Sequence, residues 1–265
     1  KSTLEQVVGW LKDEQYERAH TYVTENWLGR CQQCYQPLGD LRIDLGKGEV
    51  RGYRRELDLS SAVCTTRFER HGFEIRQEVF ASHPADAIVV RYTTASKRSF
   101  RVSLSSPHLT SIADLDDQTI SVTGRAPAMV LRRDLEVVEA QGHTRKYPEI
   151  WDSDGNRRPF ASRVLYGEHV EGKGMRFDMR VRVLSSDGDV RSEEGEIAVE
   201  DASETLLVLV ARTSFSGYDR SPSRSGSDVL TDVLVDLAAL RNASFESLLA
   251  DHTVDHASLQ ERVTI

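Results

Sequence analysis

Two short runs of cysteine and histidine have the types and spacing that suit metal or redox chemistry. Cys31 and Cys34 form a single CxxC pair, whereas a structural zinc site needs four ligands. His252 and His256 stand one helical turn apart, so one face of a helix can carry both imidazoles, but the zincin pattern needs Glu where Thr253 stands. The sequence therefore predicts neither a metal nor an organic cofactor, and it favours a packing or surface role for both histidines.

Carboxylates are abundant, with 42 acidic residues against 34 basic ones and a formal net charge of −8. Hydrolysis of a glycosidic bond needs two carboxyl groups that flank the bond, one of them kept protonated by its surroundings. The sequence singles out no such pair. The negative charge argues against a nucleic-acid partner, which selects for a basic patch, and no apolar run reaches membrane-spanning length. We expect neither kind of partner.

Two segments without clear periodicity carry the candidates for sugar binding. Residues 125–173 hold three prolines with mixed charge and aromatic residues, which predicts a long irregular loop. Residues 214–227 are rich in Ser, Gly and Arg and predict a linker or mobile loop. Aromatic faces stack on sugar rings, and Asp or His side chains bond sugar hydroxyl groups. The candidate substrate-binding residues are Trp151, Tyr166, His169, Tyr218 and Asp219.

Helical periodicity marks both ends of the chain. Apolar residues at helical spacing predict one helix near Leu4–Leu11 and a second over Asp13–Leu28, which together form a hairpin. Near the other end, an apolar stripe over Val229–Leu240 predicts a third helix. A fourth helix is expected to begin at Phe245 with Ser244 as its N-cap.

Between these ends the apolar residues alternate with period two, which is typical of strands with one buried face. His71-Gly72 and Asp187-Gly188 are predicted tight turns. The expected strands include Leu41–Leu45, Phe73–Ala81, Ala87–Thr93, Phe100–Leu104, Thr119–Thr123, Phe177–Val183, Glu196–Glu200 and Thr205–Arg212.

Some ten strands at hairpin spacing, with no helices between them, predict antiparallel sheets packed face to face. The expected fold is mainly β: an antiparallel super-sandwich with an N-terminal helical hairpin and C-terminal linker helices. Its predicted divisions are a helical hairpin at 1–30, a β-sandwich domain at 31–226 and linker helices at 227–265.

Five segments, taken in order and at their spacing, resemble the N-terminal β-domain of glycoside hydrolase family 95, the α-L-fucosidases. The resemblance runs along nearly the whole chain, although Ser216 stands where the family commonly has Asn. The five segments are Tyr35–Ile43, Tyr53–Leu59, Gln77–Ser82, Gly172–Phe177 and Thr213–Asp219.

The resemblance implies an inverting exo-glycosidase that releases α-linked L-fucose or L-galactose. In the family, the Glu that acts as acid and the Asn and Asp that activate water belong to a C-terminal helical barrel, and no position of this sequence matches them. We therefore expect no catalytic residue here. The chain is expected to be an internal piece of a much longer parent enzyme or the product of a truncated gene. The expected substrate of the parent is a fucosylated oligosaccharide, and the expected partner domain is the barrel. Localisation stays open.

Two other functions are consistent with the sequence. One is a standalone carbohydrate-binding or interaction module, since an antiparallel sandwich with aromatic loops suits that role. The other is a domain of the related sugar phosphorylases, which also place a β-sandwich before a helical barrel, although the five segments resemble them less.

Overall fold

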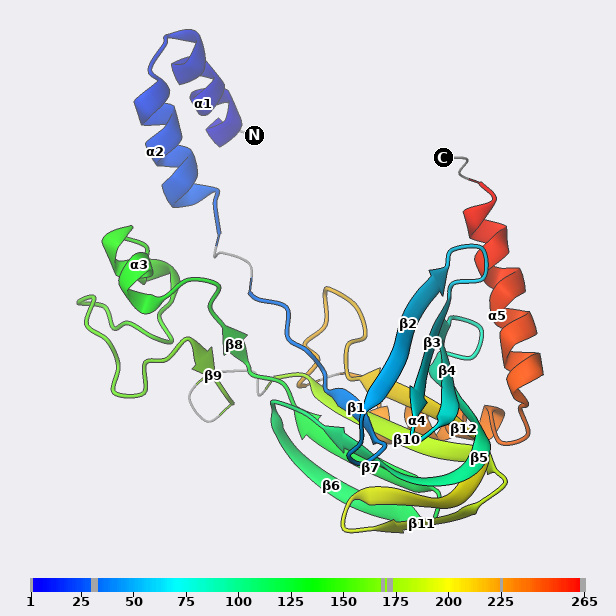
Figure 1. The fold of residues 1–265 in the computed structure, drawn as a ribbon. Coiled ribbons are helices and arrows are strands. Elements are labelled where there is room, and N and C mark those ends of the chain that lie inside the picture. The colour runs from blue at the N-terminus through cyan, green and yellow to red at the C-terminus, as the bar shows by residue number, and fades with distance from the viewer. Residues whose placement is uncertain (1, 30–32, 168–169, 171–173, 225, 263–265) are drawn as a thin grey trace. The chain divides into compact units, whose positions relative to one another are not determined.

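The computed structural model describes residues 2–29, 33–167, 170, 174–224 and 226–262 (Figure 1). The chain forms two compact units. A small unit consists of Lys1–Tyr35 and Pro127–Glu171, and a sheet unit consists of Gln36–Ala126 and Gly172–Ile265. The predicted divisions at residues 30 and 226 follow the order of elements along the chain and stay a prediction.

Ten strands of the sheet unit form one antiparallel sheet, which confirms the mainly β fold (Figure 1). The main path has the order β2-β3-β4-β5-β12-β10-β7-β6, while β1 pairs with β5 and β11 pairs with β12. The strands are β1 (Asp40–Asp44), β2 (Val50–Asp58), β3 (Val63–Arg70), β4 (Phe73–Ser82), β5 (Ala87–Ser105), β6 (Leu109–Asp116), β7 (Thr119–Arg125), β10 (Arg176–Ser186), β11 (Asp189–Glu193) and β12 (Glu196–Thr213).

The two longest strands join two layers of this sheet. The sequence predicts two separate strands within each of β5 and β12, but the structure shows one continuous strand of 19 residues and one of 18. The first part of β5 pairs with β4 and its last part with β1. Likewise β12 pairs first with β11 and then with β10. A register shift on both sides of Ala202 marks the change.

The main core of the sheet unit lies between these layers. It draws Phe100, Val102 and Ile197 from the parts of β5 and β12 that pair with β1 and β11. It also draws Met179 and Val181 from β10 in the main path. All five side chains are 4% exposed or less. Because alternate residues of each strand point to the same face, the period-two pattern fills this core from both sides.

The turn between β10 and β11 holds the register shift of β12 in place. One carboxylate oxygen of Asp187 accepts hydrogen bonds from the backbone N–H groups of Ser203 and Glu204 at 2.8 and 2.9 Å, and the other accepts from the Ser203 hydroxyl at 2.6 Å. Gly188 lies so close to β12 that a Cβ there would sit 2.2 Å from the Glu200 carbonyl oxygen. The predicted Asp-Gly turn is thus confirmed, and it also positions the longest pairing in the sheet.

Two helices cover the outer face of the sheet, and both were predicted from the sequence. Helix α4 (Val229–Ala239) and helix α5 (Phe245–Gln260) bury Val233, Leu237 and Leu248 against strands β4, β5 and β12. Ser244 caps α5, since its hydroxyl accepts a hydrogen bond from the Ser247 amide. Burial of each large apolar side chain stabilises the packing of these helices on the sheet by roughly 1.5–3 kcal/mol.

The small unit contains α1 (Ser2–Lys12), α2 (Tyr16–Asn26), β8 (Met129–Val130), α3 (Leu135–Ala140), a 3-10 turn (Thr144–Lys146) and β9 (Val164–Leu165). The predicted helical hairpin is confirmed. The stretch predicted to be an irregular loop instead has its own buried cluster, which includes Leu135, Ile150 and Leu165. Its elements are only two to six residues long, too short for periodicity to reveal.

The chain leaves the sheet unit after β7 and returns to it before β10, and a main-chain hydrogen bond joins these two points. The backbone N–H of Ala126, just after β7, donates a hydrogen bond to the Met175 carbonyl, just before β10, at 2.9 Å.

Within the described residues, no helix is long and apolar enough to cross a bilayer.

The Asp187 carboxylate gives a test of the bend in β12. Hydrogen bonds from the Glu204 backbone and from Ser203 lower the pKa of Asp187 to about 2, from an ordinary value of 3.8. Its contribution to stability is therefore present above about pH 4 and is lost as the pH falls toward about 2. We expect Asp187→Asn to lower the free energy of unfolding by about 1 kcal/mol near neutral pH, a modest loss because solvent screens the carboxylate.

Urea unfolding at several pH values measures this effect. The difference between wild type and Asp187→Asn should shrink as the pH falls toward the pKa of Asp187. The control is Asp189→Asn, which removes one negative charge from an exposed residue at the start of β11. An equal loss in both variants would contradict a specific role for Asp187.

Candidate functional site

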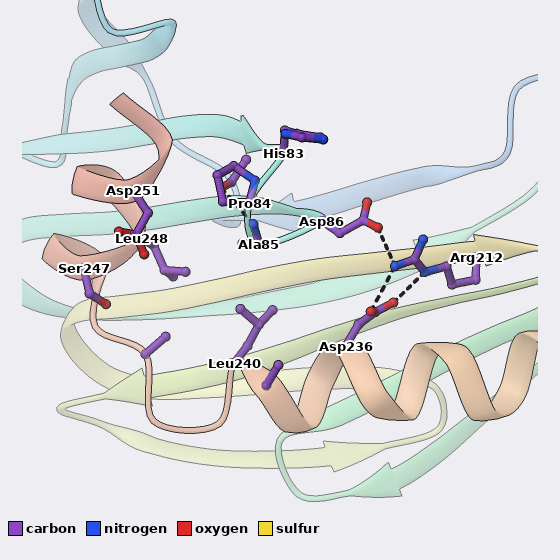
Figure 2. A pocket seen from close by; sticks show the side chains of 13 residues that line it. His83, Pro84, Ala85, Asp86, Arg212, Asp236, Leu240, Ser247, Leu248 and Asp251 are labelled. Atoms are coloured by element: carbon purple, nitrogen blue, oxygen red, sulfur yellow. Dashed lines mark hydrogen bonds and ion pairs between the residues drawn. The ribbon is translucent and has the colours of Figure 1, made fainter. Parts of the chain in front are cut away.

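A pocket of the sheet unit lies where the β4–β5 turn, α4 and α5 meet near the end of β12 (Figure 2). Its volume is about 470 Å³. The apolar part of its lining includes Leu240 and Leu248. The polar part consists of Ser82, His83, Asp86, Arg212, Asp236, Ser247 and Asp251.

Arg212 is the charged centre of this pocket. Its Nε and Nη2 atoms donate to the two carboxylate oxygens of Asp236 at 2.6 and 3.0 Å, and Nη2 also pairs with Asp86 (Figure 2). Hydrogen bonding to Asp236 raises the pKa of Arg212 above its ordinary value. The Asp236 side chain is only 16% exposed, so this ion pair is partly desolvated. The geometry fixes α4 to the end of β12 and to the β4–β5 turn.

The acidic side chains at the centre of the pocket are engaged in ion pairs. Asp86 and Asp236 both contact the Arg212 guanidinium. Asp251 and the hydroxyl groups of Ser82 and Ser247 add hydrogen-bonding atoms at the rim.

Two of the predicted sugar-binding residues lie in the described part of the small unit. Trp151 is 1% exposed, packs against Tyr147 and donates from its indole nitrogen to Glu139 at 2.9 Å. It therefore acts as a core residue of that unit. Tyr166 follows β9 and is half-buried. The third candidate, His169, lies outside the described residues.

The other two candidates lie in the sheet unit, in the loop after β12. Tyr218 is 99% exposed and Asp219 is exposed next to it. The base of this loop is anchored, because the Ser214 hydroxyl accepts a hydrogen bond from the Arg176 amide at 2.9 Å and the Arg176 side chain donates to the Ser223 carbonyl at 3.3 Å. The structure thus presents both residues to solvent on a tethered loop, and their role in sugar binding stays a prediction.

The histidine pair has structural surroundings. His252 is buried, stacks on Phe80 and bonds the Ser61 carbonyl through Nε2 at 2.9 Å. His256 bonds the Leu59 carbonyl in the same way at 2.9 Å. The pair therefore ties α5 to the β2–β3 turn. Cys31 lies outside the described residues, and in the part of the chain that the structure describes no three His, Cys, Asp or Glu side chains form a metal-binding group.

Sequence reasoning missed the pocket around Arg212. Its signal was present but weak: Arg212 ends an apolar strand, and Asp236 interrupts the apolar stripe of α4. A charge next to a buried apolar run often has a partner elsewhere in the fold, but the sequence does not say which partner.

Known proteins place these observations in a family context. Residues 1–218 match the family model described as glycosyl hydrolase family 65, N-terminal domain. Alpha-L-fucosidase 2 of Arabidopsis thaliana is 27% identical over 264 residues, which cover 96% of this chain and 29% of that protein. The probable alpha-fucosidase A of Aspergillus niger is 26% identical over 240 residues, which cover 87% and 25%. The predicted resemblance to fucosidases is confirmed, and the chain spans less than a third of these relatives.

The fold also occurs in a solved structure. A putative kojibiose phosphorylase from human microbiome aligns with a TM-score of 0.50 and 10% identity, over 83% of this chain and 28% of that one. At this identity the likeness shows a shared fold alone.

The Arg212–Asp236 pair yields a stability prediction. We expect Asp236→Asn to lower the free energy of unfolding by about 1–2 kcal/mol, because the pair is bidentate and partly buried. The control is Glu49→Gln, which breaks the exposed pair with Arg51 and should have a much smaller effect on stability. Urea unfolding compares the two variants. Similar losses would show that Arg212 does not fasten α4.

Proposed function

Because residues 1–218 match its model, this chain belongs to the glycosyl hydrolase family 65 N-terminal domain family, and on that premise we propose that it is the non-catalytic β-domain of a fucosidase-like exo-glycosidase. The parent enzyme would hydrolyse α-linked L-fucose or L-galactose with inversion, using catalytic groups of a helical domain that follows this one. The two relatives named as fucosidases support the substrate class.

The observation that carries this proposal is the second apolar face of α4. One face, with Val229, Val233 and Leu237, is buried against the sheet. An adjacent face presents Leu230 and Leu234, which are 50% and 55% exposed. A helix whose apolar side chains extend beyond the face that it buries normally packs against a further partner. A further domain packed against α4 would cover this second face, whereas a standalone module would leave it in water.

The carboxyl groups support a non-catalytic role. Among the described residues, several carboxyl groups have a shifted pKa, and the shifts are downward. In Glu139 the hydrogen bond from Arg157 lowers the pKa, and in Asp152 hydrogen bonding to the Asn156 backbone does so. Groups of this kind are ionised near neutral pH and cannot act as the proton donor of a glycosidase.

The exposed loop after β12 is the part of this domain that we propose contacts the sugar. Its tethered base would hold Tyr218 and Asp219 in a constant position, so that an aromatic face and a hydrogen-bond acceptor are presented together. Tyr166 is a second proposed contact.

A turnover assay tests the division of roles. The purified 265-residue chain should release no chromophore from a chromogenic α-L-fucoside above the background rate, because the proposed acid and base lie in another domain. A matched preparation of Asp236→Asn serves as the blank for contaminating hydrolase. Sustained turnover by wild type that scales with its concentration, and that Asp236→Asn lacks, would contradict the proposal.

Substitutions on the two faces of α4 test the proposed covering domain. In the isolated chain, Leu234→Lys should change the free energy of unfolding by less than about 0.5 kcal/mol, since that side chain is half exposed. Val233→Lys, on the buried face, should prevent folding. In the longer parent enzyme, Leu234→Lys should lower both the melting temperature and fucosidase activity. An unchanged parent enzyme would argue against a domain packed on this face.

A further inference from the structure

The helical hairpin of the small unit contains a groove separate from every residue discussed so far. It lies along one side of α1 and α2 and has a volume of about 560 Å³. We call it the hairpin groove, and its lining is Gln6, Trp10, Glu17, Thr21, Tyr22 and Glu25, together with Arg18.

Aromatic rings form one wall of the hairpin groove. The ring centres of Trp10 and Tyr22 lie 5.3 Å apart at an interplanar angle of 72°. The ring centre of Trp27, which is outside the lining, lies 6.4 Å from that of Tyr22. The Arg18 guanidinium lies 4.5 Å from the centre of the Trp10 ring, and its Nη1 donates to the Gln15 side chain at 3.1 Å. Trp10 and Tyr22 are only half-buried, so part of each ring remains open to a ligand.

The lining has no aliphatic residue. The contact that joins the two helices buries Val7 and Ala19, and the exposed aliphatic residues of α1, such as Leu4 and Val8, are absent from the lining. A groove that docks an apolar helix is expected to present aliphatic side chains. The hairpin groove instead pairs aromatic rings with carboxylate, amide and hydroxyl groups.

The charges of the groove also narrow the class of ligand. Glu17 and Glu25 against Arg18 give a net charge of −1 among the lining residues, which disfavours an anion. Arg18 already occupies the cation–π position over Trp10, so a second cation would be repelled there. A neutral ligand with one apolar face and several hydroxyl groups meets all these groups favourably. Saccharides have that chemistry.

We propose that the hairpin groove is a saccharide-binding site that holds a fucosylated oligosaccharide. The choice of fucosylated ligands rests on the proposed function. An L-fucose ring would place its methyl group and apolar face against the parts of the Trp10 and Tyr22 rings that Arg18 leaves open, and its hydroxyl groups would donate to Glu17 and Glu25. The Arg18 guanidinium would donate to a ring or hydroxyl oxygen.

Nuclear magnetic resonance of the full 265-residue chain tests this proposal directly. The three tryptophans each give an indole N–H signal, and Trp151 is an internal control because its indole is buried and bonded to Glu139. Titration with methyl α-L-fucopyranoside and with 2′-fucosyllactose should shift the Trp10 signal saturably and leave the Trp151 signal in place. We expect dissociation constants of the order of 1 mM, as is usual for a small and open site.

Substitutions that replace a carboxylate with a neutral amide of similar shape separate an effect on binding from an effect on folding. Glu17→Gln and Glu25→Gln each remove one acceptor and should weaken the apparent affinity about threefold to tenfold, while the amide spectrum stays that of the folded chain. Glu5→Gln is the matched control, since Glu5 is an exposed residue of α1 outside the groove. Equal weakening in Glu5→Gln would overturn the assignment to this groove.

The remaining outcomes are also decisive. A Trp10 signal that responds to choline or to ethylguanidinium but not to either fucoside would replace the saccharide with a cation and overturn the proposal. Saturable shifts confined to signals near Tyr218 would place sugar binding on the other unit and overturn it as well. Turnover of a chromogenic fucoside by the isolated chain would sink the proposed function but would leave the Trp10 result standing, so the two failures are distinguishable.

Discussion

The change of direction in β5 and β12 is the constraint on which the sheet unit depends. Each strand serves two layers, and the main core forms only because the parts of β5 and β12 that pair with β1 and β11 turn toward β10 and β7. One carboxylate at the β10–β11 turn satisfies two backbone N–H groups at the register shift, where regular pairing leaves them without partners. The close approach of Gly188 completes the fit. The buried main core of the sheet unit thus depends on the hydrogen bonds of the Asp187 carboxylate.

Polar contacts fix the positions of the two helices on the outer face of the sheet. Helices α4 and α5 seal that face with apolar side chains. The Arg212–Asp236 ion pair then fixes α4 to the end of β12, and the two histidine–carbonyl bonds fix α5 to the β2–β3 turn. Hydrophobic contact alone would allow the helices to slide, since it has no preferred direction. The polar bonds give them one position, and the second apolar face of α4 therefore points consistently away from the sheet.

The sequence predicted those features that depend on neighbours along the chain. Alternation located most strands, helical spacing located α1, α2, α4 and α5, and Ser244 marked the start of α5. Features that depend on distant partners were missed. The polar residues near Ala202 suggest a break between strands, whereas Asp187 carries β12 through that point without one. The pocket needed Asp86, Arg212 and Asp236 to meet from three separate elements, and no spacing rule predicts that meeting.

The segment 127–171 is joined to the sheet unit in a way that has a structural consequence. The chain departs from the sheet after β7 and rejoins it before β10 at a single point, where the amide of Ala126 bonds the carbonyl of Met175. This hydrogen bond joins main-chain atoms, so it does not depend on the side chains of the segment between them. The intervening segment also keeps a separate apolar nucleus. Substitutions within this segment therefore leave the main-chain hydrogen bond that closes the sheet unit in place.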